Sequence, residues 1–311
     1  MIGTIAVFLN YRTPHDTIRA VRSLQESASK PAAIIVVDNA SGDDSRELLA
    51  GSLPDIHLIV ADRNGGFSDG CNIGIRHALA RGARQVLLLN SDTLVPPDML
   101  GTLEQALDAD PHLGIVGPVI VSMNDPDLVQ SIGIAYTQWT GRMRHHGFGT
   151  RRSPAAAGRR DVDGVSGCAM LIRRELIDRI GLLTEDYFFG FEDLDFCLRA
   201  RAAGFRTACI EAATVLHEGS VSMGRQSGER IYFATRNHLL LARRFGAHRP
   251  AVSRWFQFGA IVALNLAYAL KGSEVPRRAG LAAFVAGVRD YLGGRSGAGR
   301  QKKRGAGPAS P

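Results

Sequence analysis

Short hydrophobic runs alternate with stretches of helical spacing over the first 110 residues of the chain. The runs are four to six residues long and predict buried strands at residues 5–9, 32–37, 56–60 and 86–89. Between them, apolar residues recur every three or four positions, as Ile18, Val21 and Leu24 do, which predicts helices at residues 16–27, 43–50, 73–81 and 97–109. Strands that alternate with helices in this way are typical of a Rossmann-like α/β fold, in which helices flank a mostly parallel sheet.

The pattern changes in the second half of the chain. Residues 114–134 favour short strands and turns, and residues 141–164 are rich in Arg, His, Gly, Pro and Ala, which predicts a mobile loop. A strand and three helices follow, at residues 165–173, 174–180, 192–203 and 229–245. We therefore expect one domain over residues 1–250, with a first half at 1–112 and a second half at 113–250.

An apolar segment at residues 255–270 is interrupted only by Gln257 and Asn265. This segment is shorter than the ~20 residues needed to span a bilayer, so we expect it to lie in a membrane interface or against the main domain. The rest of the chain then divides into an apolar helical extension at residues 251–292 and a disordered basic tail at residues 293–311.

The formal net charge of +7 lies at the C-terminal end. From Lys271 onward the chain has nine Lys and Arg residues against two acids, so the remainder is near neutral. A basic tail suits anionic lipid or nucleic acid, but the tail at residues 293–311 has no aromatic residues between its charges, which disfavours nucleic acid. The four cysteines lack zinc-binding spacing, and the N-terminus starts directly as a strand without a secretory signal. We expect a cytoplasmic protein that is peripheral on the inner face of the cell membrane.

The candidate chemistry centres on residues 187–199, where Glu192, Asp193 and Asp195 lie among aromatic and leucine residues. Buried carboxylates are costly unless they are paired or used. A carboxylate in an apolar pocket has its pKa raised, which suits a general base. An acidic first turn of a helix would also explain the run, and Asp195 is spaced to pair with Arg199. The surrounding aromatic residues favour the functional interpretation.

Polar residues also follow two predicted strands, where ligands bind in parallel sheets. Asp38 ends the second strand, and Asn90 and Asp92 follow the fourth. A carboxylate there accepts hydrogen bonds from a base or a sugar, while an Asx cap of the next helix or a strand-end turn is the structural alternative. The glycines of residues 64–74 let the backbone approach a ligand ahead of a helix N-terminus that favours a diphosphate, although such a loop alone is weak evidence.

Three later residues add to the pattern. His217 opens the segment 217–222 and is able to ligate a metal as a neutral imidazole. Gly167 allows the close approach of a substrate or a backbone, and Arg236 is placed to touch a diphosphate or to buttress the loop from His217. A structural histidine, core packing at Gly167 and a packing role for Arg236 are the alternatives.

In this order the motifs resemble those of the inverting family 2 glycosyltransferases with a GT-A fold, in particular a bacterial rhamnosyltransferase-like branch. The resemblance covers roughly residues 4–245. It implies that Asp193 is the catalytic base and that Asp92 and His217 hold Mg²⁺ or Mn²⁺, although Asn90 replaces the first acid of the family's DxD motif. It implies donor binding by Asn10, Asp38, Asn39, Asn64, Gly66, Phe67, Asn72, Asn90, Ser91 and Arg236, and acceptor-side roles for Gly167, Glu192 and Asp195.

The resemblance implies transfer of a sugar, with rhamnose favoured, from a dTDP- or UDP-linked donor. The acceptor would be a hydroxyl of a glycan or lipid-linked glycan in bacterial polysaccharide or O-antigen synthesis. Two alternatives stay open. A sugar nucleotidyltransferase would need a basic Gly-rich loop near the N-terminus, which residues 10–14 do not supply. A catalytically inactive nucleotide-sugar-binding protein is favoured only by Asn90.

Overall fold

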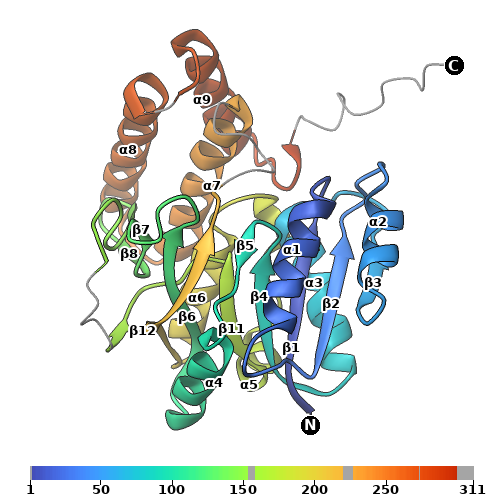
Figure 1. Cartoon of the computed structure of the whole chain (residues 1–311). Helices are drawn as coiled ribbons and strands as arrows, with labels where there is room; N and C mark the ends of the chain where they lie inside the picture. Colours follow the sequence, from blue (N-terminus) through green and yellow to red (C-terminus); the bar gives the residue numbers. More distant parts are fainter. Residues whose placement is uncertain (1, 153–157, 220–226, 273, 300–311) are drawn as a thin grey trace, which may run out of the picture.

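The computed structural model describes residues 2–152, 158–219, 227–272 and 274–299. Within these residues a ten-stranded sheet runs through the molecule, and helices cover both of its faces (Figure 1). The strands are β1 (Ile2–Asn10), β2 (Ala33–Asp38), β3 (His57–Val60), β4 (Ala83–Asn90), β5 (Thr93–Leu94), β6 (Leu113–Ser122), β7 (Val129–Ser131), β8 (Ile134–Thr137), β9 (Arg142–His145), β10 (Arg159–Asp161), β11 (Ala169–Arg173) and β12 (Arg206–His217). The helices are α1 (Pro14–Gln25), α2 (Ser45–Ser52), α3 (Gly66–Ala80), α4 (Met99–Ala109), α5 (Arg174–Ile180), η1 (Glu185–Tyr187), α6 (Glu192–Ala202), α7 (Gly228–Gly246), α8 (Ala251–Ala267), η2 (Tyr268–Gly272) and α9 (Arg277–Leu292).

Four parallel strands form one half of the sheet, in the order β3-β2-β1-β4. β11 then joins antiparallel between β4 and β6, and β12 pairs with β6 in parallel. Asn10 pairs with Asp38, and Leu9 pairs with Asn90. The carboxyl ends of these strands therefore meet at one edge of the sheet, which His217 at the end of β12 also reaches. The predicted mostly parallel α/β sheet is confirmed.

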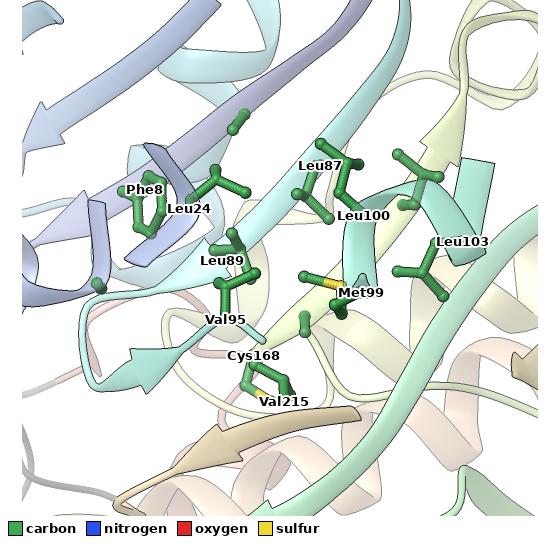
Figure 2. Packing of buried hydrophobic residues seen from close by; sticks show 14 of the residues in the cluster. Phe8, Leu24, Leu87, Leu89, Val95, Met99, Leu100, Leu103, Cys168 and Val215 are labelled. Carbon is green, nitrogen blue, oxygen red and sulfur yellow. The ribbon is translucent and has the colours of Figure 1, made fainter. Parts of the chain in front are cut away.

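Alternate residues along each strand build two cores, one on each face of the sheet. Phe8 packs in the core that contains residues of α1, α2 and α4, whereas its neighbour Val7 packs with residues of α3, α5 and α6. Figure 2 shows the first core, in which Leu24, Leu89 and Met99 gather over the sheet. Burial of a side chain of this size contributes about 1.5–3 kcal/mol, so the two cores fix the register of the strands.

Two elements begin or extend differently from the prediction. α3 starts at Gly66, whereas the helix was predicted over residues 73–81 after a glycine-rich loop, so residues 66–72 are the first part of the helix. β6 is one continuous strand of ten residues, where short strands and turns were predicted. Nine of its ten residues are buried, because β12 and β11 pair with its two sides.

The region predicted as a mobile loop contains β9, which forms a two-stranded hairpin with β8, and β10. Residues 153–157 of that region lie outside the described residues.

β12 was not predicted. Its sequence is rich in Ala and Thr, and its pairing with β6 shifts register between Ile210 and Thr214, so no regular alternation of apolar residues marks it as a strand.

The last three helices, α7, α8 and α9, form a layer next to one end of the sheet (Figure 1). α9 packs closely on α7, since a Cβ on Gly287 would lie 2.8 Å from the Tyr232 carbonyl oxygen. Over the described residues no helix has the length and apolar character needed to cross a membrane. Residues 293–299 of the predicted tail continue from α9, and residues 300–311 lie outside the described residues.

Candidate active site

Asp38 is buried beneath the carboxyl edge of the sheet. Its carboxylate accepts hydrogen bonds from Asn10 Nδ2 at 2.7 Å and from the hydroxyl and the backbone N–H of Ser41. Asn10 is fully buried, and its side-chain oxygen accepts a hydrogen bond from the Thr17 hydroxyl at 2.8 Å. Asp38 therefore closes the turn 38–41 and does not cap α2. A direct contact between Asn10 and the donor was predicted, but in the structure the Asn10 side chain supports Asp38.

Asn39 connects this turn to the start of α3. Its Nδ2 donates to the Asn64 side-chain oxygen at 3.1 Å and to the Gly66 carbonyl at 3.0 Å. Gly66 has φ +87°, and a Cβ there would lie 2.3 Å from the Phe188 carbonyl oxygen, so glycine is required. The Phe67 N–H donates to that carbonyl at 2.7 Å. One of the first amides of α3 therefore holds the segment before α6.

Asn72 has a different role from the predicted donor contact. Its Nδ2 donates to the Leu183 carbonyl and to Glu185 Oε1, both at 2.9 Å, and its Oδ1 accepts from the Leu183 N–H at 3.0 Å. The side chain is buried. These contacts use its hydrogen-bonding groups, so we assign Asn72 to the connection between α3 and the segment that leads to α6.

Asp92 and His217 lie together at the carboxyl edge, with His217 Nε2 3.3 Å from Asp92 Oδ1. Gln130 fixes the imidazole tautomer. Its Nε2 donates to the His217 carbonyl at 3.0 Å, so its Oε1 accepts from His217 Nδ1 at 2.9 Å. In the neutral ring the Nε2 lone pair therefore faces a carboxylate oxygen. Two acceptors at this separation fit adjacent ligands of an octahedral Mg²⁺ or Mn²⁺, which lie about 3 Å apart.

Asn90 adds a third oxygen at the same strand end, since its Oδ1 is buried and has no hydrogen-bond partner among the described residues. Ser91 beside it accepts from the Thr13 hydroxyl at 3.1 Å. Across the part of the chain that the structure describes, no group of three or more His, Cys, Asp or Glu side chains could hold a metal. The residues fit a divalent cation that diphosphate oxygens and water would complete, as is usual for Mg²⁺. Residues 220–222 of the His217 motif lie outside the described residues.

Asp195 is a structural residue, although an acceptor-side role was predicted. It is fully buried in α6 and accepts hydrogen bonds from the Tyr187 hydroxyl at 2.9 Å, from Arg199 Nε at 2.9 Å and from Arg244 Nη1 at 3.1 Å. Two cations and a hydroxyl compensate its buried charge. The alternative that Asp195 pairs with Arg199 is therefore correct.

Glu192 and Asp193 have contrasting environments at the start of α6. Glu192 is buried, and its Oε2 has no hydrogen-bond partner within the described structure. Burial and then the charge of Asp193 raise the pKa of Glu192 to about 8. Asp193 is half-buried and accepts from the Gly167 N–H at 3.1 Å and from the Leu194 N–H at 2.7 Å. Burial also raises the pKa of Asp193, and these two N–H groups oppose that shift.

A two-residue bridge joins Asp193 to the Asn90–Asp92 turn. Gly167 donates its N–H to Asp193, and the carbonyl of the next residue, Cys168, accepts from the Asn90 N–H at 3.0 Å. A Cβ on Gly167 would lie 3.3 Å from the Phe67 ring and 3.4 Å from Asp193 Cβ. Gly167 therefore preserves the space between these two side chains, as the predicted close approach requires.

His145 belongs to the region predicted as a mobile basic loop, where a contact with an acceptor diphosphate was weighed against a solvated loop. It lies in β9, and its Nδ1 is 2.9 Å from the Ser131 hydroxyl. Burial lowers the pKa of His145, and the charge of Asp193 opposes that shift. The signal that could have revealed the hairpin is the Arg-Met-Arg-His alternation directly after Gly141.

Arg236 is fully buried and binds a different loop from the one predicted. Its Nη2 donates to the Tyr187 carbonyl at 2.8 Å. The adjacent Asn237 donates through Nδ2 to the carbonyls of Tyr187, Phe189 and Gly190 at 2.8, 2.8 and 3.0 Å. Arg236 therefore buttresses the segment before Glu192, and residues 220–226 of the loop from His217 lie outside the described residues.

Comparison with known proteins identifies relatives of this chain. The chain is similar to the low-salt glycan biosynthesis hexosyltransferase Agl10 of Haloferax volcanii, with 27% identity over 250 residues that cover 75% of this chain and 73% of that protein. It is also similar to the N-acetylglucosaminyl-diphospho-decaprenol L-rhamnosyltransferase of Mycobacterium tuberculosis, with 25% identity over 266 residues that cover 78% of this chain and 85% of that protein.

The fold is similar to that of the mannosyltransferase PcManGT from Pyrobaculum calidifontis, solved in complex with GDP-Man and Mn²⁺. The TM-score is 0.58 at 17% sequence identity, and the match covers 93% of this chain and 86% of that chain. This likeness shows a GT-A fold. The model of the family described as glycosyltransferase like family 2 matches residues 6–238, which is most of the chain. The chain therefore belongs to the glycosyltransferase like family 2.

Proposed function

We propose that this protein transfers a sugar from a nucleoside-diphosphate donor to a hydroxyl acceptor with inversion at the anomeric carbon, and that Asp193 is the general base. The observation that carries the proposal is the Gly167–Cys168 bridge, which joins Asp193 to the Asn90–Asp92 turn. This bridge keeps the proposed base close to the proposed diphosphate site. That proximity would allow Asp193 to act on the acceptor hydroxyl while the donor diphosphate is held at the strand ends.

In this reaction Asp193 accepts the proton of the acceptor hydroxyl while that oxygen attacks the anomeric carbon. The bond between the anomeric carbon and the diphosphate breaks, and the nucleoside diphosphate leaves. Two backbone N–H groups, from Gly167 and Leu194, hold the carboxylate in place. Since the pKa of Glu192 is about 8, this neighbour is protonated at neutral pH and adds no second charge beside the base.

Asp92 and His217 would hold Mg²⁺ or Mn²⁺. When bound, such an ion neutralises the charge that develops on the leaving diphosphate. The donor would lie along the carboxyl edge of the sheet, on one side of Gly167, with the acceptor on the side of Asp193 and Glu192. The residues that we propose for the donor are Asp38, Asn39, Asn64, Gly66, Phe67, Asn90 and Ser91.

We propose dTDP-rhamnose as the donor, ahead of a UDP-linked sugar, and a glycan or lipid-linked glycan of bacterial polysaccharide synthesis as the acceptor. Support comes from the relative whose name specifies an L-rhamnosyltransferase and a lipid diphosphate.

We also propose that α8 rests on the inner face of the cytoplasmic membrane. Its polar residues Gln257 and Asn265 are buried against the protein, whereas Trp255 and Phe256 are 71% and 62% exposed. This reverses the usual amphipathic arrangement and leaves an apolar face outward. The extension is also basic, because residues 251–299 contain six Lys and Arg and two acids, which suits anionic lipid.

The test is a transfer assay with Mn²⁺, a lipid-diphosphate acceptor and the donors dTDP-rhamnose, UDP-glucose and GDP-mannose. We expect acceptor-dependent release of nucleoside diphosphate from the dTDP donor, loss of that release with EDTA, and an inverted anomeric configuration by NMR. A product with retained configuration would refute the single displacement and the role of Asp193 as base. Absence of release from every donor would favour the non-catalytic alternative.

A further inference from the structure

We propose that the C-terminal extension, residues 251–299, helps to position the catalytic base. Buried residues of α7 connect it to residues 186–191, which we call the catalytic loop because they lead directly into Glu192 and Asp193. The inference rests on the proposed function of Asp193. It assigns positioning roles to Asn265 and Gly297, which lie outside the residues matched by the family model.

The catalytic loop has a backbone shape that needs external support. Phe188 has φ +64° and Phe191 has φ +77°, in the left-handed region that residues other than glycine rarely occupy. Phe191 is the residue before the first turn of α6, so its conformation sets the direction in which Asp193 leaves the loop. Unfavourable backbone conformations of this kind persist where surrounding contacts enforce them.

Three consecutive buried residues of α7 supply this support. Asn237 holds the carbonyls of the catalytic loop, and Arg236 donates to the carbonyls of Asp186 and Tyr187. The ring of His238 stacks on Phe191 with centroids 5.1 Å apart. Together they contact the loop from Asp186 to Phe191.

His238 is held in turn by α8. Its Nε2 lies within hydrogen-bond distance of the Gly141 carbonyl, and its Nδ1 is 3.0 Å from Asn265 Nδ2. A carbonyl only accepts, so Nε2 carries the proton and Nδ1 accepts from Asn265. Burial lowers the pKa of His238, which favours this neutral ring. Asn265 therefore fixes the orientation of the ring that packs on Phe191.

Arg236 is held by the segment after α9. Its Nη1 donates to the Gly297 carbonyl at 2.6 Å, and the Gly297 N–H donates to the Asp186 carbonyl at 2.7 Å. The guanidinium also lies over the Tyr232 ring, 5.4 Å from its centroid, and the Tyr232 hydroxyl donates to Asp290 of α9 at 2.9 Å. Gly297 thus contacts the catalytic loop both directly and through Arg236.

Through Phe188 the catalytic loop also meets the start of α3 at Phe67, but the contacts from α7 do not reach the strand ends that carry Asp38 and Asp92. Loosening the extension should therefore misplace the base while these strand ends keep their shape. The expected signature is a lower kcat with an unchanged Kd for the nucleotide, because small errors in the position of a catalytic group are costly in rate. A loss of folding alone would lower kcat and weaken nucleotide binding together.

The first test compares Asn265→Leu with Gln257→Leu in the full chain. Both changes remove a buried polar side chain of α8, but Gln257 donates to the Gln138 carbonyl at 2.6 Å, whereas Asn265 bonds His238 of α7. We expect Asn265→Leu to lower kcat by about 10- to 100-fold with the nucleotide Kd within about twofold, and to speed hydrogen exchange of amides 187–193. Gln257→Leu should retain kcat. Equal kcat in the two variants would overturn the inference.

The second test uses Gly297→Ala and Gly294→Ala, which should both fold because they lie beyond the last helix. Both glycines have positive φ, +64° and +67°, and no described atom lies within 4 Å of an added Cβ, so the backbone strain is matched. The Gly294 N–H bonds Tyr291, away from the catalytic loop. We expect Gly297→Ala to lower kcat by roughly threefold or more and Gly294→Ala to leave it unchanged. If the wild type is active but kcat is the same in Asn265→Leu and Gln257→Leu, and the same in Gly297→Ala and Gly294→Ala, the inference is overturned and the proposed function stands. An inactive wild type would refute the proposed function on which the inference rests.

Discussion

The donor edge and the catalytic loop are supported in different ways. The donor edge consists of the ends of β1, β2, β4 and β12, and strand register places Asn10 beside Asp38 and Leu9 beside Asn90. The catalytic loop has no strand register to hold it. Side chains of α7 donate to its carbonyls, and three of its residues, Phe188, Gly190 and Phe191, have positive φ.

This difference indicates that substrate binding and turnover depend on separate parts of the molecule. Cooperative strand pairing and two hydrophobic cores support the donor edge, so single polar changes there should act locally on the ligand. A few buried hydrogen bonds support the catalytic loop, so each of them has a large effect on the position of Asp193. Mutations can therefore separate donor affinity from kcat.

The largest effect is expected from Asn237→Leu, which removes the donor to three carbonyls of the catalytic loop. The Tyr187 carbonyl keeps its hydrogen bond from Arg236, whereas the Phe189 and Gly190 carbonyls lose their donor and each carry a desolvation cost. The free energy of unfolding should therefore fall by about 3 kcal/mol, with kcat reduced and nucleotide Kd retained. Urea unfolding followed by circular dichroism measures the first quantity. Asn124→Leu, at an exposed position, is the control and should cost less than about 0.5 kcal/mol. Similar losses in both variants would show that the loop does not depend on Asn237.

Asp92→Ala should produce the opposite separation at the donor edge. We expect loss of the metal-dependent thermal stabilisation by dTDP or UDP, which at a ligand concentration of 100 Kd amounts to about 2.7 kcal/mol. The stability of the unliganded protein should change little. Asp98→Ala is the control, because Asp98 is an exposed carboxylate a few residues away. Retained metal-dependent stabilisation in Asp92→Ala would remove Asp92 from the proposed cation site.

Glu192→Gln tests the buried carboxyl of the catalytic side through pH. The folded protein holds the Glu192 proton up to a pKa of about 8, compared with an ordinary value of 4.5, so between these values it binds more protons than the unfolded chain. Stability from this group therefore falls as the pH rises from about 4.5 to 8. The Gln variant lacks this dependence, so it should gain stability relative to the wild type across that window, on the order of 1–3 kcal/mol. A pH-independent difference between the two proteins would contradict the raised pKa.

The smallest effect on the isolated protein is expected on the outer face of α8. The double change Trp255→Ser and Phe256→Ser should alter the free energy of unfolding by less than about 0.5 kcal/mol, because both side chains are largely exposed. It should reduce sedimentation with phosphatidylglycerol-containing vesicles by about tenfold or more. Val60→Ser, on the edge strand β3, is the control. Unchanged vesicle binding in the double variant would refute the proposed membrane contact.

The two regions also differ in how far the sequence could predict them. The parallel strands and the polar residues at their ends follow from short-range hydrophobic patterns, and the helix at residues 174–180 was predicted with its observed bounds. The roles of Asn72 and Arg236 were not predictable in this way, because their partners lie 111 and 49 residues away in sequence, at Leu183 and Tyr187. A local motif identifies a polar residue, but only the fold decides whether it faces a ligand or a carbonyl.

The most direct test of the account is to measure kcat and the nucleotide Kd of Asp193→Asn in the transfer assay, with Asp178→Asn as the control. Asp178 is an exposed carboxylate on α5 that pairs with Arg174, so it undergoes the same chemical change away from the site. We predict that Asp193→Asn lowers kcat by about 10²- to 10⁴-fold with the Kd within about twofold, and that Asp178→Asn matches the wild type. A kcat for Asp193→Asn equal to that of Asp178→Asn would contradict the assignment of Asp193 as the general base.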